Sequence, residues 1–238
     1  MVTKPTGHDH PDPALPARPA AGSRPAASRS GDAAWLAQAR SHLRGADPVL
    51  ARLIDARPDF DPRAWLARLP PMDLYGALLF QITGQQLSVA VTRRTIARIQ
   101  DLFGGHLPAP AELLAVAPER LREAGLSWRK VGTLRDLAER LTDGRLDADA
   151  LATLPDDELM AQLTAIPGIG PWTVQGTLLI ALHREDIVLP GDLALRKAIQ
   201  AAYRLDHLPS QDEVVAIAEP WRPYRSLATS YLFSATTG

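Results

Sequence analysis

Two short segments combine residue types that can do chemistry, and they lie close together in the sequence. The first, Ile166–Gly170, is an Ile-Pro-Gly-Ile-Gly turn between two helical patterns. Two glycines one residue apart permit positive φ and the close approach of another backbone. If a helix begins directly after the turn, its free amides and its dipole favour a phosphate. A phosphate-binding turn and a plain tight turn in a helical hairpin are both compatible with this segment.

The second segment, Val188–Leu193, supplies a carboxylate at Asp192, 22 residues after Gly170. The apolar residues before it carry the chain inward and a Pro-Gly pair turns it, which places Asp192 at the start of a helix over Leu193–Tyr203. Aspartate is a good N-cap, which is a structural role. A carboxylate can also stabilise a developing positive charge or orient an attacking water. The turn and the carboxylate together favour a functional site more than either does alone.

The elements that must position these residues are helices. The apolar residues of Ser88–Phe103 and of Ser127–Leu141 recur at helical spacing. Proline is favoured in the first turn of a helix, and seven prolines stand where a helix could begin: Pro48, Pro62, Pro71, Pro110, Pro118, Pro155 and Pro209. Long alternating β-branched runs are missing. The pattern predicts a compact all-α fold of around ten helices.

Composition narrows the class of protein. The 238 residues are 46% hydrophobic and 22% charged, with 26 Lys and Arg against 27 Asp and Glu. The net charge therefore does not indicate a nucleic-acid-binding protein. Cysteine is absent, which excludes disulfides, thiolate zinc sites, iron–sulfur clusters and cysteine nucleophiles. The six histidines show no ligand spacing with carboxylates, so we expect neither a catalytic metal nor a cofactor. No apolar run approaches the roughly 18 residues of a membrane span, and the polar start lacks a secretory signal; we expect a cytoplasmic protein.

The composition divides the chain into a short N-terminal segment and a long remainder. Residues 1–33 are rich in proline and alanine and poor in large apolar side chains, so we predict a disordered tail. Residues 34–238 form the predicted helical domain. Within it, Arg93, Arg94 and Arg98 lie in a stretch without acidic residues, either a phosphate-binding stripe or a solvated helix face.

Four motifs in order resemble one family. The hairpin turn followed by the Leu-Pro-Gly-Asp loop resembles the helix–hairpin–helix (HhH-GPD) DNA glycosylase superfamily. Ile82–Val89 resembles its Gly-Gln-Gln-x-Ser motif, and Gly125–Ser127 with Lys130 resembles its Gly-x-Ser-x-x-Lys segment. Trp221–Ala228 resembles the terminal Trp-x-Pro-x-Arg-Ser-x-Ala motif of the 3-methyladenine DNA glycosylase II (AlkA-like) branch. The likeness runs from about residue 34 to the end.

The resemblance implies a two-lobed helical fold with a DNA-binding cleft between the lobes, a hairpin at about 163–183 and a catalytic loop at 187–193. Asp192 would be catalytic. The DNA-binding residues would come from the hairpin and from the loop that probes the minor groove: Gly168, Ile169, Gly170 and Thr173, with Gln85, Gln86, Leu87 and Ser88. Either Gln86 or Leu87 would be the wedge that fills the space of an extruded base.

Single positions indicate which members of the superfamily this chain resembles most. Bifunctional members place a nucleophilic lysine where this chain has Trp172, so the resemblance implies a monofunctional enzyme that leaves the abasic site intact. No segment is long enough for the extra N-terminal β domain, which implies the compact form. Trp172 and Phe233 align with aromatic residues of the base pocket. Gly176 stands where longer homologues have a pocket tyrosine, so the pocket would be wider or shaped for different lesions.

The implied activity is the removal of alkylated bases such as 3-methyladenine and 7-methylguanine in base excision repair. These bases are cations, and an electron-rich aromatic wall favours a cation. The partner would be double-stranded DNA with damaged bases, with no membrane and no second subunit. Two alternatives remain open: a glycosylase for another lesion, such as uracil or hypoxanthine, and a non-catalytic helix–hairpin–helix DNA-binding module.

Overall fold

The computed structural model describes residues 29–66, 69 and 72–236, and these form thirteen α-helices and a short 3-10 helix, with no strand in the described part. The first helices are α1 (Arg29–Ala46), α2 (Pro48–Asp55), α3 (Leu74–Gly84), α4 (Val89–Leu102), α5 (Pro110–Ala115), α6 (Pro118–Glu123) and α7 (Trp128–Thr142). They are followed by α8 (Ala148–Thr153), α9 (Asp156–Thr164), α10 (Pro171–Ile180), α11 (Leu193–Tyr203), α12 (Gln211–Ala218), η2 (Glu219–Trp221) and α13 (Arg225–Thr236). The predicted all-α class is confirmed, with more helices than expected.

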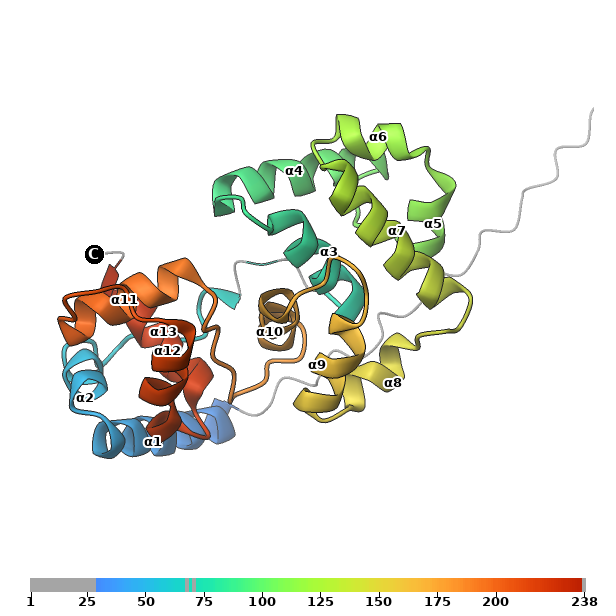
Figure 1. The fold of residues 1–238 in the computed structure, drawn as a ribbon. Coiled ribbons are helices and arrows are strands. Elements are labelled where there is room, and N and C mark those ends of the chain that lie inside the picture. The colour runs from blue at the N-terminus through green and yellow to red at the C-terminus, as the bar shows by residue number, and fades with distance from the viewer. Residues whose placement is uncertain (1–28, 67–68, 70–71, 237–238) are drawn as a thin grey trace, which may run out of the picture.

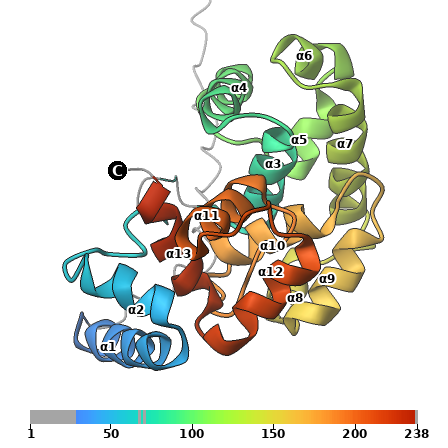
Figure 2. The same cartoon turned by 60° about the vertical axis from the view of Figure 1, so that its left-hand side comes forward.

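The helices gather in two lobes (Figures 1 and 2). The terminal lobe consists of α1, α2, α11, α12, η2 and α13, which pack on one another although they come from both ends of the chain. The central lobe consists of α3 to α10, in which α7 packs against α5, α6 and α3. Helix α10 contacts α3 and α9 and lies between the two groups in both views. One continuous apolar core joins both lobes.

Local signals set many helix ends. Pro48, Pro110 and Pro118 occupy first helical positions, as predicted. Pro155 instead caps α9, and Pro209 precedes the Ser210 cap of α12. Pro62 lies in a series of turns and begins no helix, and Pro71 lies outside the described residues.

The tail that we predicted to end at residue 33 overlaps the fold, because α1 begins at Arg29. Residues 1–28 lie outside the described part. No helix of the described part is long and apolar enough to cross a membrane, and no group of three or more His, Asp or Glu in that part could hold a metal ion.

A buried carboxylate ties the terminal lobe together. Asp47 caps α2, and its Oδ1 accepts from the amides of Val49 and Leu50 at 2.7 and 3.2 Å. Its Oδ2 accepts from Trp221 Nε1 at 2.9 Å and from the Tyr203 hydroxyl. Burial raises the pKa of Tyr203, so this hydroxyl stays protonated as a donor. One side chain thus joins α2, η2 and the C-terminal end of α11.

Candidate active site

A cleft of about 860 Å³ lies where the two lobes meet. The central lobe contributes residues from the ends of α3, α7 and the hairpin, and the terminal lobe contributes the start of α11. The lining residues are Gly84, Gln85, Gln86, Leu87, Ser127, Arg129, Lys130, Gly168, Ile169, Gly170, Trp172, Thr173, Gly191, Asp192, Leu193 and Ala194. The structure therefore brings three of the four sequence motifs to one cleft, at the place predicted for it.

The hairpin turn requires glycine at Gly168. Its φ is +92°, and an added Cβ would lie 2.0 Å from Thr133 Oγ1 on α7. Gly170 is the N-cap of α10, and no side chain caps this helix. A Cβ added at Gly170 would have no atom within 4 Å. Pro171 has no amide, and the amides of Thr173 and Val174 donate to the Gly170 carbonyl at 3.0 and 3.2 Å. The amides of Gly170 and Trp172 are therefore the ones that an anion in the cleft can use.

Two hairpin residues that the resemblance assigned to DNA binding have buried side chains. Ile169 is 4% exposed and packs into the core, so only its backbone can face the cleft. Thr173 is 2% exposed, and its Oγ1 accepts a hydrogen bond from Gln85 Nε2 at 2.9 Å. Both side chains hold the turn in place.

The loop after α3 is fixed to the hairpin from two sides. Gln85 Nε2 donates to the Gly168 carbonyl at 3.0 Å as well as to Thr173. Lys130 Nζ donates to the carbonyls of Thr83 and Gln85 at 2.7 and 2.8 Å, and burial lowers the pKa of this lysine. Gln85 and Lys130 thus position the loop, a role that the motif suggested for neither.

The tip of this loop projects into the cleft. Gln86 is exposed and has a positive φ of 58°, and Leu87 is 39% exposed. Both line the cleft, so their positions do not decide between them. Ser88 is the N-cap of α4, accepts from the Val91 amide at 3.4 Å, and does not line the cleft.

Asp192 is held by donors on both of its oxygens. It is the N-cap of α11, and its Oδ1 accepts from the Leu195 amide at 2.8 Å, as the structural interpretation predicted. Its Oδ2 accepts from Trp172 Nε1 at 2.9 Å. Capping and orientation toward the cleft are therefore compatible, because each uses a different oxygen.

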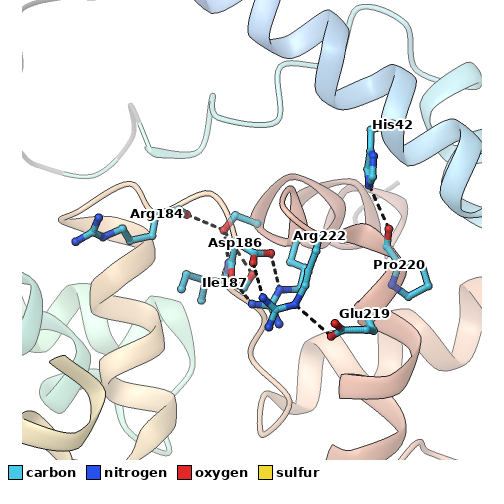
Figure 3. A network of polar contacts seen from close by, with 9 residues as sticks. His42, Arg184, Asp186, Ile187, Glu219, Pro220 and Arg222 are labelled. Atoms are coloured by element: carbon cyan, nitrogen blue, oxygen red, sulfur yellow. Dashed lines mark hydrogen bonds and ion pairs between the residues drawn. The ribbon is translucent and has the colours of Figure 1, made fainter. Parts of the chain in front are cut away.

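The terminal motif does not reach the cleft but holds the chain that leads to Asp192. Ser226 Oγ donates to the Arg184 carbonyl at 2.7 Å and accepts from the Ile187 amide at 3.0 Å. Arg225 donates to the side chain and carbonyl of Asp186, both at 2.6 Å, and Arg222 adds a contact to Asp186 at 3.2 Å. Figure 3 shows this network around Asp186. The motif anchors residues 184–187 and thereby fixes the direction of the loop that leads to Asp192.

A second cavity of about 490 Å³ shares Asp192 with the cleft. Phe233 lines this cavity, whereas Trp172 lines the cleft, so these two predicted pocket residues lie in adjoining spaces. The other lining residues are Phe60, Asp61, Ala64, Trp65, Leu179, Leu189, Thr229, Ser230 and Ser234. Sequence reasoning missed Phe60, Trp65 and Thr229, because no pattern in their own segments marks them as neighbours of Asp192.

Gly176 lines neither space, and this corrects the expectation of a wider pocket there. It is buried between α10 and α3, where an added Cβ would lie 2.4 Å from Gln81 Nε2. The Gln81 side chain therefore fills the place left by the absent side chain of residue 176.

The fold and this site define a class. This is an all-α protein in which a helix begins directly after a hairpin turn and lies beside a carboxylate held in a fixed position. These features define a helix–hairpin–helix protein with a candidate catalytic residue. Residues 80–223 match the HhH-GPD superfamily base excision DNA repair protein family. The chain belongs to this family.

Similar proteins cover most of the chain. DNA-3-methyladenine glycosylase 1 of Schizosaccharomyces pombe is 30% identical over 203 residues, which cover 84% of this chain and 88% of the relative. DNA-3-methyladenine glycosylase 2 of Escherichia coli is 30% identical, covering 78% of this chain and 64% of the relative. The solved S. pombe 3-methyladenine DNA glycosylase in complex with abasic DNA superposes with a TM-score of 0.76 at 27% identity, over 84% of this chain and 97% of that one.

Proposed function

We propose that this protein is a monofunctional DNA glycosylase of base excision repair. It extrudes alkylated bases such as 3-methyladenine and 7-methylguanine from duplex DNA and hydrolyses their N-glycosidic bonds, leaving abasic sites. The names of its relatives support the substrate class. The observation that carries the proposal is the placement of Asp192, held by Trp172 where the cleft meets a second, largely apolar cavity.

In this proposal the cleft holds the DNA backbone. The amides at the start of α10 bind phosphate without regard to sequence, which suits an enzyme that must search all DNA. A base inside the duplex is out of reach and must be extruded. Gln86 or Leu87, at the exposed tip of the loop, fills the vacated space.

Asp192 would act on the sugar. Breaking the N-glycosidic bond builds positive charge on the sugar ring, and a carboxylate beside it stabilises that charge and orients the attacking water. At about 4 Å and an effective dielectric near 20, the attraction is roughly 4 kcal/mol, or about a thousandfold in rate. An alkylated purine is already cationic and leaves without much help from an acid.

The cleft offers no free amine for a covalent Schiff base. The residue two positions after Gly170 is Trp172, and Lys130 is the one lysine among the described lining residues. Its Nζ is occupied by the carbonyls of Thr83 and Gln85. These contacts support hydrolysis without strand cleavage.

Base release from a duplex with methylated purines tests the proposal, with the wild type beside Asp192→Asn. Asparagine caps helices as well as aspartate does, so the variant should fold and bind DNA while its excision rate falls by about a thousandfold. Strand breaks should appear only after alkali.

Three results would contradict parts of this proposal. Undiminished excision by Asp192→Asn would remove the catalytic assignment. Breaks before alkali would remove the monofunctional assignment. A wild type that binds DNA and releases no methylated purine would leave another lesion, such as hypoxanthine or uracil, or a non-catalytic DNA-binding module.

A further inference from the structure

Two exposed arginines of α4 have no part in the reaction proposed above. Arg94 and Arg98 are four residues apart, so they lie on the same side of the helix, one turn from each other. Like charges at this spacing repel each other and destabilise a helix. Within the described residues neither arginine has an ion pair or a side-chain hydrogen bond. Arg140 near the end of α7, by contrast, pairs with Asp136 at 2.8 Å.

The side chain of Arg98 reaches the junction of α6 and α7. A Cβ added at Gly125 in this junction would lie 3.7 Å from Arg98 Nη1. Three residues after Gly125, Trp128 begins α7 with a side chain that is 57% exposed. The guanidinium of Arg122 lies 5.5 Å from the centre of the Trp128 ring. In both views α4, α6 and α7 lie at the end of the central lobe away from α1 and α2 (Figures 1 and 2). We refer to four residues of this region as the flank surface: Arg94, Arg98, Arg122 and Trp128.

The flank surface adjoins the cleft but lies outside it. Arg129, the residue after Trp128, lines the cleft, whereas no residue of the flank surface lines either the cleft or the cavity beside Asp192. On its other side the surface ends at a hollow that contains Asp101 and Glu123. Trp128 is the one aromatic residue among the exposed large apolar side chains of the described part. A positively charged surface with an exposed indole thus leads out of the cleft and ends where acidic residues begin.

We propose that the flank surface binds duplex DNA on one side of the lesion, where the duplex leaves the cleft. The inference rests on the proposed function, because it takes the same DNA as its partner, and it adds a contact outside the site of base release. Arg94 and Arg98 each neutralise a phosphate, and the exposed ring of Trp128 packs on a deoxyribose. Contacts with phosphate and sugar hold the duplex without reading its sequence, which suits a surface that meets any flanking sequence.

The salt dependence of DNA binding tests the two arginines. The probe is a long duplex with a tetrahydrofuran abasic analogue at its centre, which needs no base release. Arg94→Ala and Arg98→Ala should each weaken binding by a few-fold, and the slope of log K against log salt should decrease by about 0.9 for each lost phosphate contact. Arg52→Ala is the matched control, since Arg52 is exposed on α2 in the terminal lobe and its loss changes the net charge equally. Its slope should equal that of the wild type.

Shortening the duplex on either side of the analogue locates the contact. Trimming one side should weaken binding by the wild type, and on that trimmed duplex Arg94→Ala and Arg98→Ala should bind as tightly as the wild type does. Trp128→Ala should weaken binding of the long duplex several-fold, and Trp128→Phe should weaken it less because phenylalanine keeps a ring. The long duplex should also quench a part of the tryptophan fluorescence that Trp128→Phe lacks.

The outcomes distinguish this inference from the proposed function. If Arg94→Ala and Arg98→Ala keep the wild-type slope on the long duplex, the inference is wrong. If Arg52→Ala loses as much, or if the α4 variants lose as much on both trimmed duplexes, the cause is net charge or the cleft, and the inference also falls. If the wild type releases no methylated purine while the slopes change as expected, the flank surface stands and the proposed activity is wrong.

Discussion

The two walls of the cleft are built from different parts of the polypeptide. The hairpin wall, residues 166–171 with Thr173, presents mainly backbone: glycines at its turn, buried side chains at Ile169 and Thr173, and a helix start without a side-chain cap. The side-chain wall consists of Asp192 and of Trp172, whose indole orients Asp192, and it adjoins a cavity of aromatic residues. One wall offers groups that every residue has, and the other offers groups that only particular residues have.

This difference corresponds to what each wall would have to recognise. Phosphates are the same along all DNA, so fixed backbone amides suffice for them. A damaged base differs from its neighbours by a few atoms, and only side chains can distinguish it. Substitutions in the hairpin wall should therefore act mainly through folding, and substitutions in the side-chain wall should act mainly through chemistry.

The largest effect on folding is expected for Gly168→Ala. The new Cβ would lie 2.0 Å from Thr133 Oγ1, at a residue whose φ is +92°. Positive φ costs a non-glycine residue roughly 1–2 kcal/mol, and overpacking typically adds about 1–3 kcal/mol. We expect unfolding in urea to show a loss of about 2–4 kcal/mol.

Two further variants test the cause. Gly132→Ala lies on α7 with nothing within 4 Å of the new Cβ, so it should raise stability by about 0.5–1 kcal/mol. Adding Thr133→Ala to Gly168→Ala should restore part of the loss, since it removes the atom in closest contact but leaves the unfavourable φ. A double variant no more stable than Gly168→Ala would show that the contact with α7 is not the cause.

Substitutions in the side-chain wall should lower the rate of base release rather than the stability, and Trp172→Phe tests this. Phenylalanine keeps an aromatic ring but cannot donate to Asp192 Oδ2, so the carboxylate loses its orientation. A hydrogen bond to a charged group contributes about 1.5–3 kcal/mol, and we expect kcat for base release to fall at least about tenfold with KM within about twofold.

The matched control is Trp221→Phe, which also removes an indole donor from a carboxylate, here the buried Asp47. That pair lies away from the cleft, so this variant should lower the melting temperature and leave kcat of the folded enzyme unchanged. Equal losses of kcat in the two variants would mean that Trp172 acts through folding, and the comparison of the walls would fail.

The ends of several helices could be predicted because their causes are local. Helix α11 begins and ends at the predicted residues, and α4 and α7 lie within one residue of their predicted ends. Capping residues and apolar spacing act over a few positions, and both are visible in the sequence. Gly168 could be recognised for the same reason, although Thr133, which also requires it, could not.

The side-chain wall could be predicted only in part, since its pieces meet through the tertiary fold. Phe60 and Phe233 border one cavity although most of the chain separates them. The expectation for Gly176 was wrong because Gln81, on another helix, occupies the vacant space. The terminal motif was recognised, but its contacts with Asp186 and Ile187 depend on how α13 packs. A motif identifies such residues without giving their partners.

The smallest effect is expected at the rim of the hairpin wall, for Arg129→Ala. Arg129 is exposed and lines the cleft beside Lys130, where it can neutralise one phosphate without reading a base. Affinity for undamaged and damaged duplexes should fall by the same few-fold factor, and the slope of log K against log salt should decrease by about 0.9. Arg145→Ala is the control, because Arg145 pairs with Asp143 at the far end of α7, and its slope should equal that of the wild type. A loss confined to damaged DNA would place Arg129 with the side-chain wall, and the division between backbone recognition and base recognition would have to be redrawn at α7.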